Sequence, residues 1–264
     1  MSASDPAVAQ PTLEKFRDLP FGVSHRDAIQ NYFAWQAAEF AAVGKVLDHG
    51  AGSGALGVAL LRAGVRELVM LEPEASLAAL MRSRFADEPQ VEVFQGTIDD
   101  YLALSGPGAI DTVVTSNVLE HIQDDSACLR SMRELLAPGG RLGVYVPARR
   151  ELFGSLDRAV GHVRRYSAQE LRSKLASAGF SIDELRYCNL LGVVPWLVAG
   201  RVLKRKALGS ESHRLFDRLF PTFAALEKGL RIPYGLNLLA LCRKPSVGPS
   251  AAAHGEQKYE KAGH

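Results

Sequence analysis

The sequence predicts an α/β fold with a doubly wound, mostly parallel sheet of seven strands and a helical cap inserted near the C-terminus. Three observations favour this fold. Short apolar runs alternate with longer helical patterns, which is typical of βαβ units whose sheet is covered on both faces. A glycine-rich loop joins the first apolar run to the helix that follows it. The segment at about 191–233 is too long for an ordinary connection and carries helical patterns of its own.

Each element follows from its local pattern. Strands are expected at seven apolar runs, at residues 44–50, 67–73, 91–96, 110–117, 140–147, 181–190 and 236–244. Helices are expected at 31–40, 55–64, 74–86, 123–140 and 166–180, with two more in the cap, at 194–207 and 213–230. Gly64 ends the helix after the glycine loop.

The ends of the chain differ in composition from its middle. Residues 1–12 and 246–264 are rich in small residues and Pro or in charge, so we expect both ends to be disordered. Residues 13–245 are then a single domain, which includes the cap at about 191–233.

Composition excludes several classes of protein. A net charge of +2 over 264 residues is too small to favour a nucleic-acid partner. The first residues lack the pattern of a signal segment, and the apolar stretch 190–200 is about half of the roughly 20 residues that a membrane-spanning helix needs. The three cysteines are far apart, which argues against disulfides or a zinc cluster and favours a cytoplasmic location. No metal is expected.

The loop within VLDHGAGSGALG, residues 46–57, indicates a ligand site, because so much glycine is needed only where the backbone turns tightly or approaches something closely. The loop matches the dinucleotide fingerprint G-x-G-x-x-G/A, with Glu72 about 20 residues further on to accept from ribose hydroxyls. The same residues match a second pattern equally well. This pattern is a strand that ends in an acid, here Asp48, followed by G-x-G-x-G. A P-loop is excluded because no G-K-[S/T] follows.

Motifs later in the sequence indicate which of these two patterns the glycine loop follows. TSNVLEHIQDD and LLAPGGRLGVYVP, together with VLDHGAGSG and MLEPEASLAALMR, resemble in order and spacing the motifs of class I S-adenosylmethionine-dependent methyltransferases over roughly residues 40–150. FGSLDRAVGHVRRYSAQELRSKLASAGF is similar to the segment after the fifth strand in small-molecule members of that superfamily. The resemblance implies a Rossmann-like methyltransferase fold, an S-adenosyl-L-methionine cofactor and methyl transfer.

The resemblance also implies a set of cofactor-binding residues. Asp48 would hold the amino group of the cofactor, Glu72 would accept from both ribose hydroxyls, and Pro73 would lie against the adenine. The full set is Asp48, Gly50, Ala51, Gly52, Gly54, Glu72, Pro73, Thr97, Ile98, Asn117 and Val118. This chain departs from the family pattern at His49 and at 96–98, where an acid that binds the adenine amino group is replaced by Gly-Thr-Ile.

The methyl acceptor is expected to be a small, partly apolar molecule. The chain lacks the Pro-Pro-aromatic run and the Pro-Cys nucleophile of enzymes that methylate nucleic-acid bases. Transfer requires in-line orientation and often removal of a proton, for which His162 and Tyr166 are the catalytic candidates. The candidates for acceptor binding are Tyr32, Trp35, His121, Arg150 and Arg165, and the cations among them favour an anionic acceptor.

Two alternatives stay open. The cap has an apolar part around Trp196 followed by basic residues, which fits a hydrophobic lid and also a peripheral membrane-contact surface; we favour the lid. The rival functions are an NAD(P)-dependent oxidoreductase that uses the same loop and a non-catalytic protein that binds S-adenosylmethionine.

Overall fold

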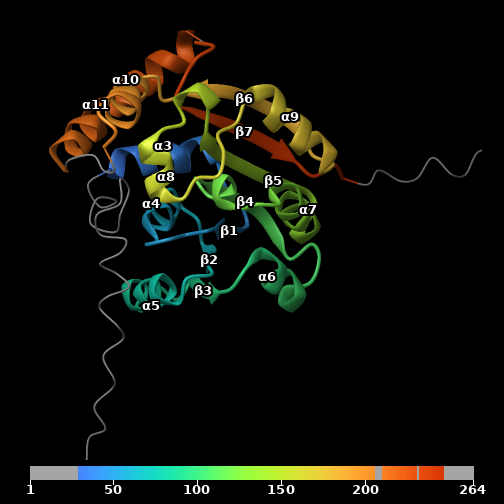
Figure 1. Ribbon diagram of the computed structural model, residues 1–264. Helices are drawn as coiled ribbons and strands as arrows, with labels where there is room; N and C mark the ends of the chain where they lie inside the picture. The colour runs from blue at the N-terminus through green and yellow to red at the C-terminus, as the bar shows by residue number, and fades with distance from the viewer. Residues whose placement is uncertain (1–28, 206–209, 231, 247–264) are drawn as a thin grey trace, which may run out of the picture.

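A seven-stranded sheet forms the centre of the molecule in the computed structural model, which describes residues 29–205, 210–230 and 232–246 (Figure 1). The strand order is β3-β2-β1-β4-β5-β7-β6. The strands are β1 (Lys45–His49), β2 (Glu67–Glu72), β3 (Val91–Gln95), β4 (Ile110–Ser116), β5 (Leu136–Pro147), β6 (Ser181–Cys188) and β7 (Asn237–Arg243). β7 is antiparallel to both of its neighbours, and the other pairs are parallel. The predicted fold class is therefore confirmed.

Helices cover both faces of the sheet and bury an apolar core on each. One core includes side chains of α6 (Ile98–Ser105), α7 (Asp125–Leu135) and α9 (Ala168–Ser177). The other includes side chains of α3 (Gln30–Phe40), α4 (Ala55–Arg62), α5 (Ala75–Arg84) and α11 (Ser210–Leu230). This three-layer arrangement is the one that parallel βαβ units require.

Two differences between the predicted and the observed helices have clear structural reasons. The helix predicted at 123–140 ends at Leu135, because Leu136 already pairs with Ile110 of β4 and so begins β5. Helix α6 was absent from the prediction. It begins with a capping box in which the Thr97 hydroxyl accepts from the Asp100 N–H and the Asp100 carboxylate accepts from the Thr97 N–H.

The cap consists of helical segments, as predicted. A short helix, α8 (Ser155–Val160), precedes it, and the cap itself comprises α10 (Val193–Leu197), the π-helical turn η3 (Val198–Val202) and α11. In the described part of the chain, no helix is both long and apolar enough to cross a bilayer. The predicted disordered ends, residues 1–12 and all but the first residue of 246–264, lie outside the described residues.

Candidate active site

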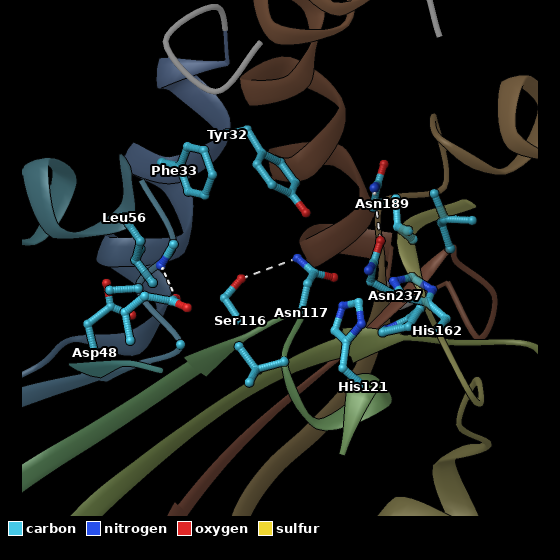
Figure 2. A pocket seen from close by; sticks show the side chains of 18 of the residues that line it. Tyr32, Phe33, Asp48, Leu56, Ser116, Asn117, His121, His162, Asn189 and Asn237 are labelled. Carbon is cyan, nitrogen blue, oxygen red and sulfur yellow. Dashed lines mark hydrogen bonds between the residues drawn. The ribbon is translucent and has the colours of Figure 1, made fainter. Parts of the chain in front are cut away.

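A cavity of about 380 Å³ opens beyond the carboxyl ends of β1 and β4, where the strand order changes direction (Figure 2). Crevices at such switch points are the usual ligand sites of α/β sheets. Its lining residues are Tyr32, Phe33, Asp48, Gly50, Ala51, Gly52, Leu56, Glu72, Pro73, Leu77, Ser116, Asn117, Val118, His121, Pro147, Val160, His162, Arg165, Asn189, Trp196, Phe216, Leu236 and Asn237. Asp48 and Leu56 lie on one side of the cavity, and His121 and His162 lie on the other.

The loop between β1 and α4 needs glycine at two positions. Gly50 has a φ of +72°, and a Cβ atom there would lie 2.5 Å from Cγ2 of Val118. Gly54 has a φ of +79°, and a Cβ atom there would lie 2.6 Å from the Phe85 ring. Gly50 therefore lets the loop pass close to the end of β4. Gly54 lies outside the cavity lining and allows α4 to begin against α5.

Glu72 ends β2 beside this loop, and its carboxylate is held from two sides. Oε2 accepts from the Gly52 N–H at 2.9 Å, and Oε1 accepts from the Glu74 N–H at 3.0 Å. The residue is only 7% exposed. Since each carboxylate oxygen has two lone pairs, both can accept a further hydrogen bond from a ligand in the cavity.

The turn after β4 forms the floor of the cavity. Asn117 has a φ of +54°, a left-handed conformation that Asn tolerates better than most residues. Its N–H donates to the Tyr145 carbonyl at 2.8 Å, and its side-chain amide donates to the Ser116 hydroxyl at 3.3 Å. Strained backbone of this kind clusters at ligand sites.

The opposite side of the cavity is organised by a buried carboxylate, Asp157 of α8. Its Oδ1 accepts from His162 Nδ1 at 2.9 Å and from Arg165 Nε at 2.7 Å, and its Oδ2 accepts from the indole N–H of Trp196 at 3.2 Å. Burial alone would raise the pKa of Asp157, but the hydrogen bonds from His162 and Arg165 outweigh burial and lower it. The ionised carboxylate thus fixes the His162 ring with Nδ1 protonated and Nε2 as the acceptor.

A second buried carboxyl, that of Glu120, lies near Nε2 of His162. Glu120 is fully buried, and neither of its side-chain oxygens has a hydrogen-bond partner among the described residues. Its Oε1 is 3.5 Å from His162 Nε2, and burial raises the pKa of Glu120 to about 8. The carboxyl is therefore mostly protonated at neutral pH.

The same region contains the described residues best placed to hold a metal ion. Glu120, His121 and His162 each offer a ligand atom, and these atoms lie within 4.8 Å of one another.

Several predicted site residues lie elsewhere. Tyr166 is fully buried and donates its hydroxyl to Asp125 at 2.7 Å, while Thr97 caps α6 and Ile98 packs in the core. None of the three lines the cavity. The structure thus indicates that Tyr166 ties the α9 region to α7, because its hydroxyl proton is engaged and burial raises its pKa.

Arg150 and Trp35 also lie outside the cavity lining. The Arg150 guanidinium is 70% exposed and pairs with Glu170 at 2.8 Å. Trp35 packs edge-on against Tyr145 and Phe220, behind the cavity wall. Proximity in sequence to a motif does not determine the direction of a side chain, which is why these two predictions place the residues in the site while the structure does not.

His49, the departure beside the glycine loop, has a structural role. It is buried, and its Nδ1 lies 3.1 Å from the Thr115 hydroxyl. Burial lowers the pKa of His49 to about 4, so it is neutral at physiological pH.

The sequence analysis missed part of the site. No sequence pattern assigns a role to Asp157, Glu120, Asn189, Phe216 or Asn237. Glu120 stands directly before His121 in LEHI, but an acid on a short turn carries no sign of burial. Phe216 and Asn237 come from α11 and β7, whose approach to the cavity follows from the fold alone.

Comparison of the sequence with known proteins identifies a family that matches this chain. The methyltransferase domain family matches residues 24–185. The Mycobacterium tuberculosis protein named "Probable S-adenosylmethionine-dependent methyltransferase Rv3030" is 33% identical over 138 residues, which is 51% of this chain and 48% of the relative. The ubiquinone biosynthesis O-methyltransferase of Xanthomonas euvesicatoria is 36% identical over 99 residues, or 37% of this chain and 41% of the relative.

Structural comparison agrees on the fold. A SAM-dependent methyltransferase from Archaeoglobus fulgidus superposes with a TM-score of 0.57 at 16% identity, covering 89% of this chain and 98% of that protein. The chain spans about half the length of the curated relatives that it matches. The family match covers more than half of the chain and includes the glycine loop, Glu72 and Asp157. The chain therefore belongs to the methyltransferase domain family, within the class I S-adenosylmethionine-dependent methyltransferases.

Proposed function

We propose that this protein transfers a methyl group from S-adenosylmethionine to a small, partly apolar acceptor. One observation carries the proposal. A single cavity joins the glycine loop and Glu72 on one side to His162, held by Asp157, on the other. The first side suits the cofactor, and the second suits a molecule that loses a proton as it accepts the methyl group.

The residues of the first side fit S-adenosylmethionine. Glu72 keeps lone pairs for two ribose hydroxyls while the Gly52 and Glu74 N–H groups hold it in place. Asp48 lines the cavity near the loop and supplies an anion for the amino group of the cofactor. Pro73 and Leu77 offer an apolar wall for the adenine. When bound, the cofactor supplies a sulfonium methyl group.

The residues of the second side orient the acceptor and remove its proton. His162 Nδ1 donates to Asp157, which leaves Nε2 as the basic atom of the ring. Once the ring has taken a proton, the Asp157 carboxylate stabilises the imidazolium. A base of this kind suits a hydroxyl acceptor, in agreement with the Xanthomonas relatives named O-methyltransferases.

The walls around His162 favour an acceptor with an apolar body. Tyr32, Phe33, Trp196, Phe216 and Leu236 supply aromatic and aliphatic surface. The predicted preference for an anionic acceptor has less support. Arg165 is buried and already paired with Asp157, and Arg150 lies outside the lining. An acceptor with one protic group and an apolar body fits this surface better than a strongly charged one.

Calorimetric titration with S-adenosylhomocysteine and, separately, with NADH tests the cofactor assignment. We expect the former to bind and the latter not to bind. Glu72→Ala should lose at least about tenfold in affinity, because two charge-assisted hydrogen bonds are removed. Glu67→Ala, at the exposed start of the same strand, is the matched control and should bind normally. Binding of NADH alone would instead support the oxidoreductase alternative.

A second assay separates the enzyme from a protein that only binds the cofactor. Purified protein is incubated with methyl-labelled S-adenosylmethionine and a panel of phenolic and aliphatic hydroxyl compounds. Labelled product that disappears in His162→Gln, while S-adenosylhomocysteine still binds, supports catalysis. Normal cofactor binding with no product from an extract of cellular metabolites would contradict it.

A further inference from the structure

The outer surface of the cap is unusually apolar. Of the 13 large hydrophobic side chains that are exposed in the described part of the chain, ten lie between residues 194 and 230. We call these ten the cap surface: Val194, Leu197, Val198, Val202, Leu203, Leu215, Leu219, Phe223, Leu226 and Leu230. In Figure 1, α10 and α11 lie at the same end of the molecule, far from α6.

Helix α11 has two apolar faces. Phe220 and Ala224 face inward and pack in the core of the molecule. Leu215, Leu226 and Leu230 are 61%, 55% and 63% exposed and recur at helical spacing on the outer face. A helix that only closed the cavity would need the first face and would gain nothing from the second.

Among the cap residues whose side chains are described, 193–205 and 214–230, the exposed charges are all positive. The exposed basic residues are Arg201, Lys204, Arg205, Arg214, Arg218 and Lys228, of which Lys228 pairs with Glu39. The acids with described side chains in residues 193–205 and 214–230 are Asp217 and Glu227, and both are buried and bonded to backbone N–H groups. The apolar side chains of the cap surface are therefore flanked by basic side chains.

We propose that the cap surface lies on a bilayer that contains anionic lipids. Apolar side chains flanked by Lys and Arg are the pattern of helices that rest in the membrane interface. A second copy of the chain is a poorer occupant, because a two-fold contact would place cations of the same sign opposite one another. This proposal is independent of the transferred group, since membrane binding requires no turnover.

Co-sedimentation of the full chain with vesicles tests this proposal. We expect binding to vesicles of phosphatidylglycerol and phosphatidylcholine, and weaker binding to phosphatidylcholine alone. High salt should weaken the binding, because it screens the cationic contribution. Absence of binding to the mixed vesicles, or equal binding to both kinds of vesicle, would overturn the proposal.

Two variants address the two components of the surface. Leu215→Ser combined with Leu226→Ser and Leu230→Ser should abolish vesicle binding. Lys204→Glu combined with Arg205→Glu should weaken it by roughly 25-fold or more, since each cation near the membrane contributes about fivefold. Leu104→Ser on α6 and Arg66→Glu are the matched controls, because both residues are exposed elsewhere.

Titration with S-adenosylhomocysteine reports whether the variants keep their fold. Variants that bind it normally but have lost the vesicles support the proposal. Unchanged vesicle binding in both cap variants would overturn it. So would a concentration-dependent dimer without lipid that the leucine variant converts to monomer, because that result assigns the cap surface to a second copy of the chain.

Discussion

Asp157 accepts four hydrogen bonds at the acceptor side of the cavity and joins the segment after β5 to the cap. It accepts from the Gly154 N–H, the His162 ring, the Arg165 guanidinium and the Trp196 indole, at 2.7 to 3.2 Å. The first three donors belong to the segment after β5, and the fourth belongs to the cap. One carboxylate thus sets the tautomer of the proposed base and also fixes the cap above it.

Replacing Asp157 by Asn should slow methyl transfer without a matching loss of cofactor binding. The amide has one acceptor oxygen, one NH2 group and no charge, so it cannot accept from all four donors, and an NH2 group that faces His162 Nδ1 would move the ring proton to Nε2. We expect kcat to fall about 10²- to 10⁴-fold, with the acidic limb of the pH profile shifted. The double variant Asp157→Asn/His162→Gln should be no slower than His162→Gln alone.

Additive losses in that double variant would show that Asp157 does not act through His162. Asp183→Asn is the matched control, because Asp183 forms an exposed ion pair with Arg243 on the far edge of the sheet. It should leave kcat unchanged.

The residues that could be predicted from the sequence are those that a motif and a known spacing place together. The glycine loop and Glu72 meet across adjacent parallel strands, so a motif and a spacing of 20 residues are enough to pair them. Asp157 could not be assigned a role in this way, because no motif marks its contacts with His162 and Arg165 and only the fold brings Trp196 of the cap to it.

At the scale of elements, α11 is joined to the rest of the molecule by its two buried acids. Asp217 accepts from the Asn31 N–H at 3.2 Å and from the Tyr32 N–H at 2.9 Å, in the first turn of α3. Helix α3 has no capping side chain of its own at its N-terminus. Asp217, which is 185 positions from Tyr32 in the sequence, therefore caps the N-terminus of α3.

Asp217→Ala should destabilise the protein by about 1 to 2 kcal/mol, the usual loss for an N-cap, because two N–H groups of α3 lose their acceptor. Urea denaturation followed by circular dichroism measures the change. The neighbouring Arg218 is exposed, so Arg218→Ala provides the comparison. A loss no larger than that of the control would mean that α11 does not stabilise α3 through this carboxylate.

The strands and most helices could be predicted because their apolar periodicity is a local property. The end of α7 could not, because Leu136 leaves the helix in order to pair with Ile110, a contact between segments 26 residues apart. Helix α6 is only eight residues long, so its apolar positions at Ile98, Tyr101 and Leu102 make a pattern too short to identify a helix without the Thr97–Asp100 capping box. Local pattern therefore gives an element's type more reliably than its boundary.

At the scale of the whole molecule, two buried groups titrate with opposite effects on stability. The pKa of Glu120 is raised from 4.5 to about 8, and that of His49 is lowered from 6.5 to about 4, in both cases chiefly by burial. For Glu120 the unfolded chain ionises first as pH rises, so stability falls between about 4.5 and 8. For His49 the unfolded chain binds a proton first as pH falls, so stability falls below about 6.5. Between about pH 4.5 and 6.5, the effects of Glu120 and His49 on the pH dependence of stability therefore oppose each other.

Above pH 6.5, of these two groups only Glu120 still makes the unfolding free energy depend on pH. The Glu120→Gln variant should therefore show a flatter pH dependence of the unfolding free energy in that range. A shifted group changes that free energy by about 1.4 kcal/mol per pH unit, or about 2 kcal/mol between pH 6.5 and 8. Glu120 faces His162, Arg165 and Asp157, and all three side chains remain in the variant. Denaturant unfolding across this range should therefore show the wild type losing stability relative to Glu120→Gln.

Glu92→Gln, at an exposed carboxylate, should follow the wild type. Parallel profiles for all three proteins would mean that Glu120 is ionised in the folded state and that His162 or Arg165 carries its counter-charge.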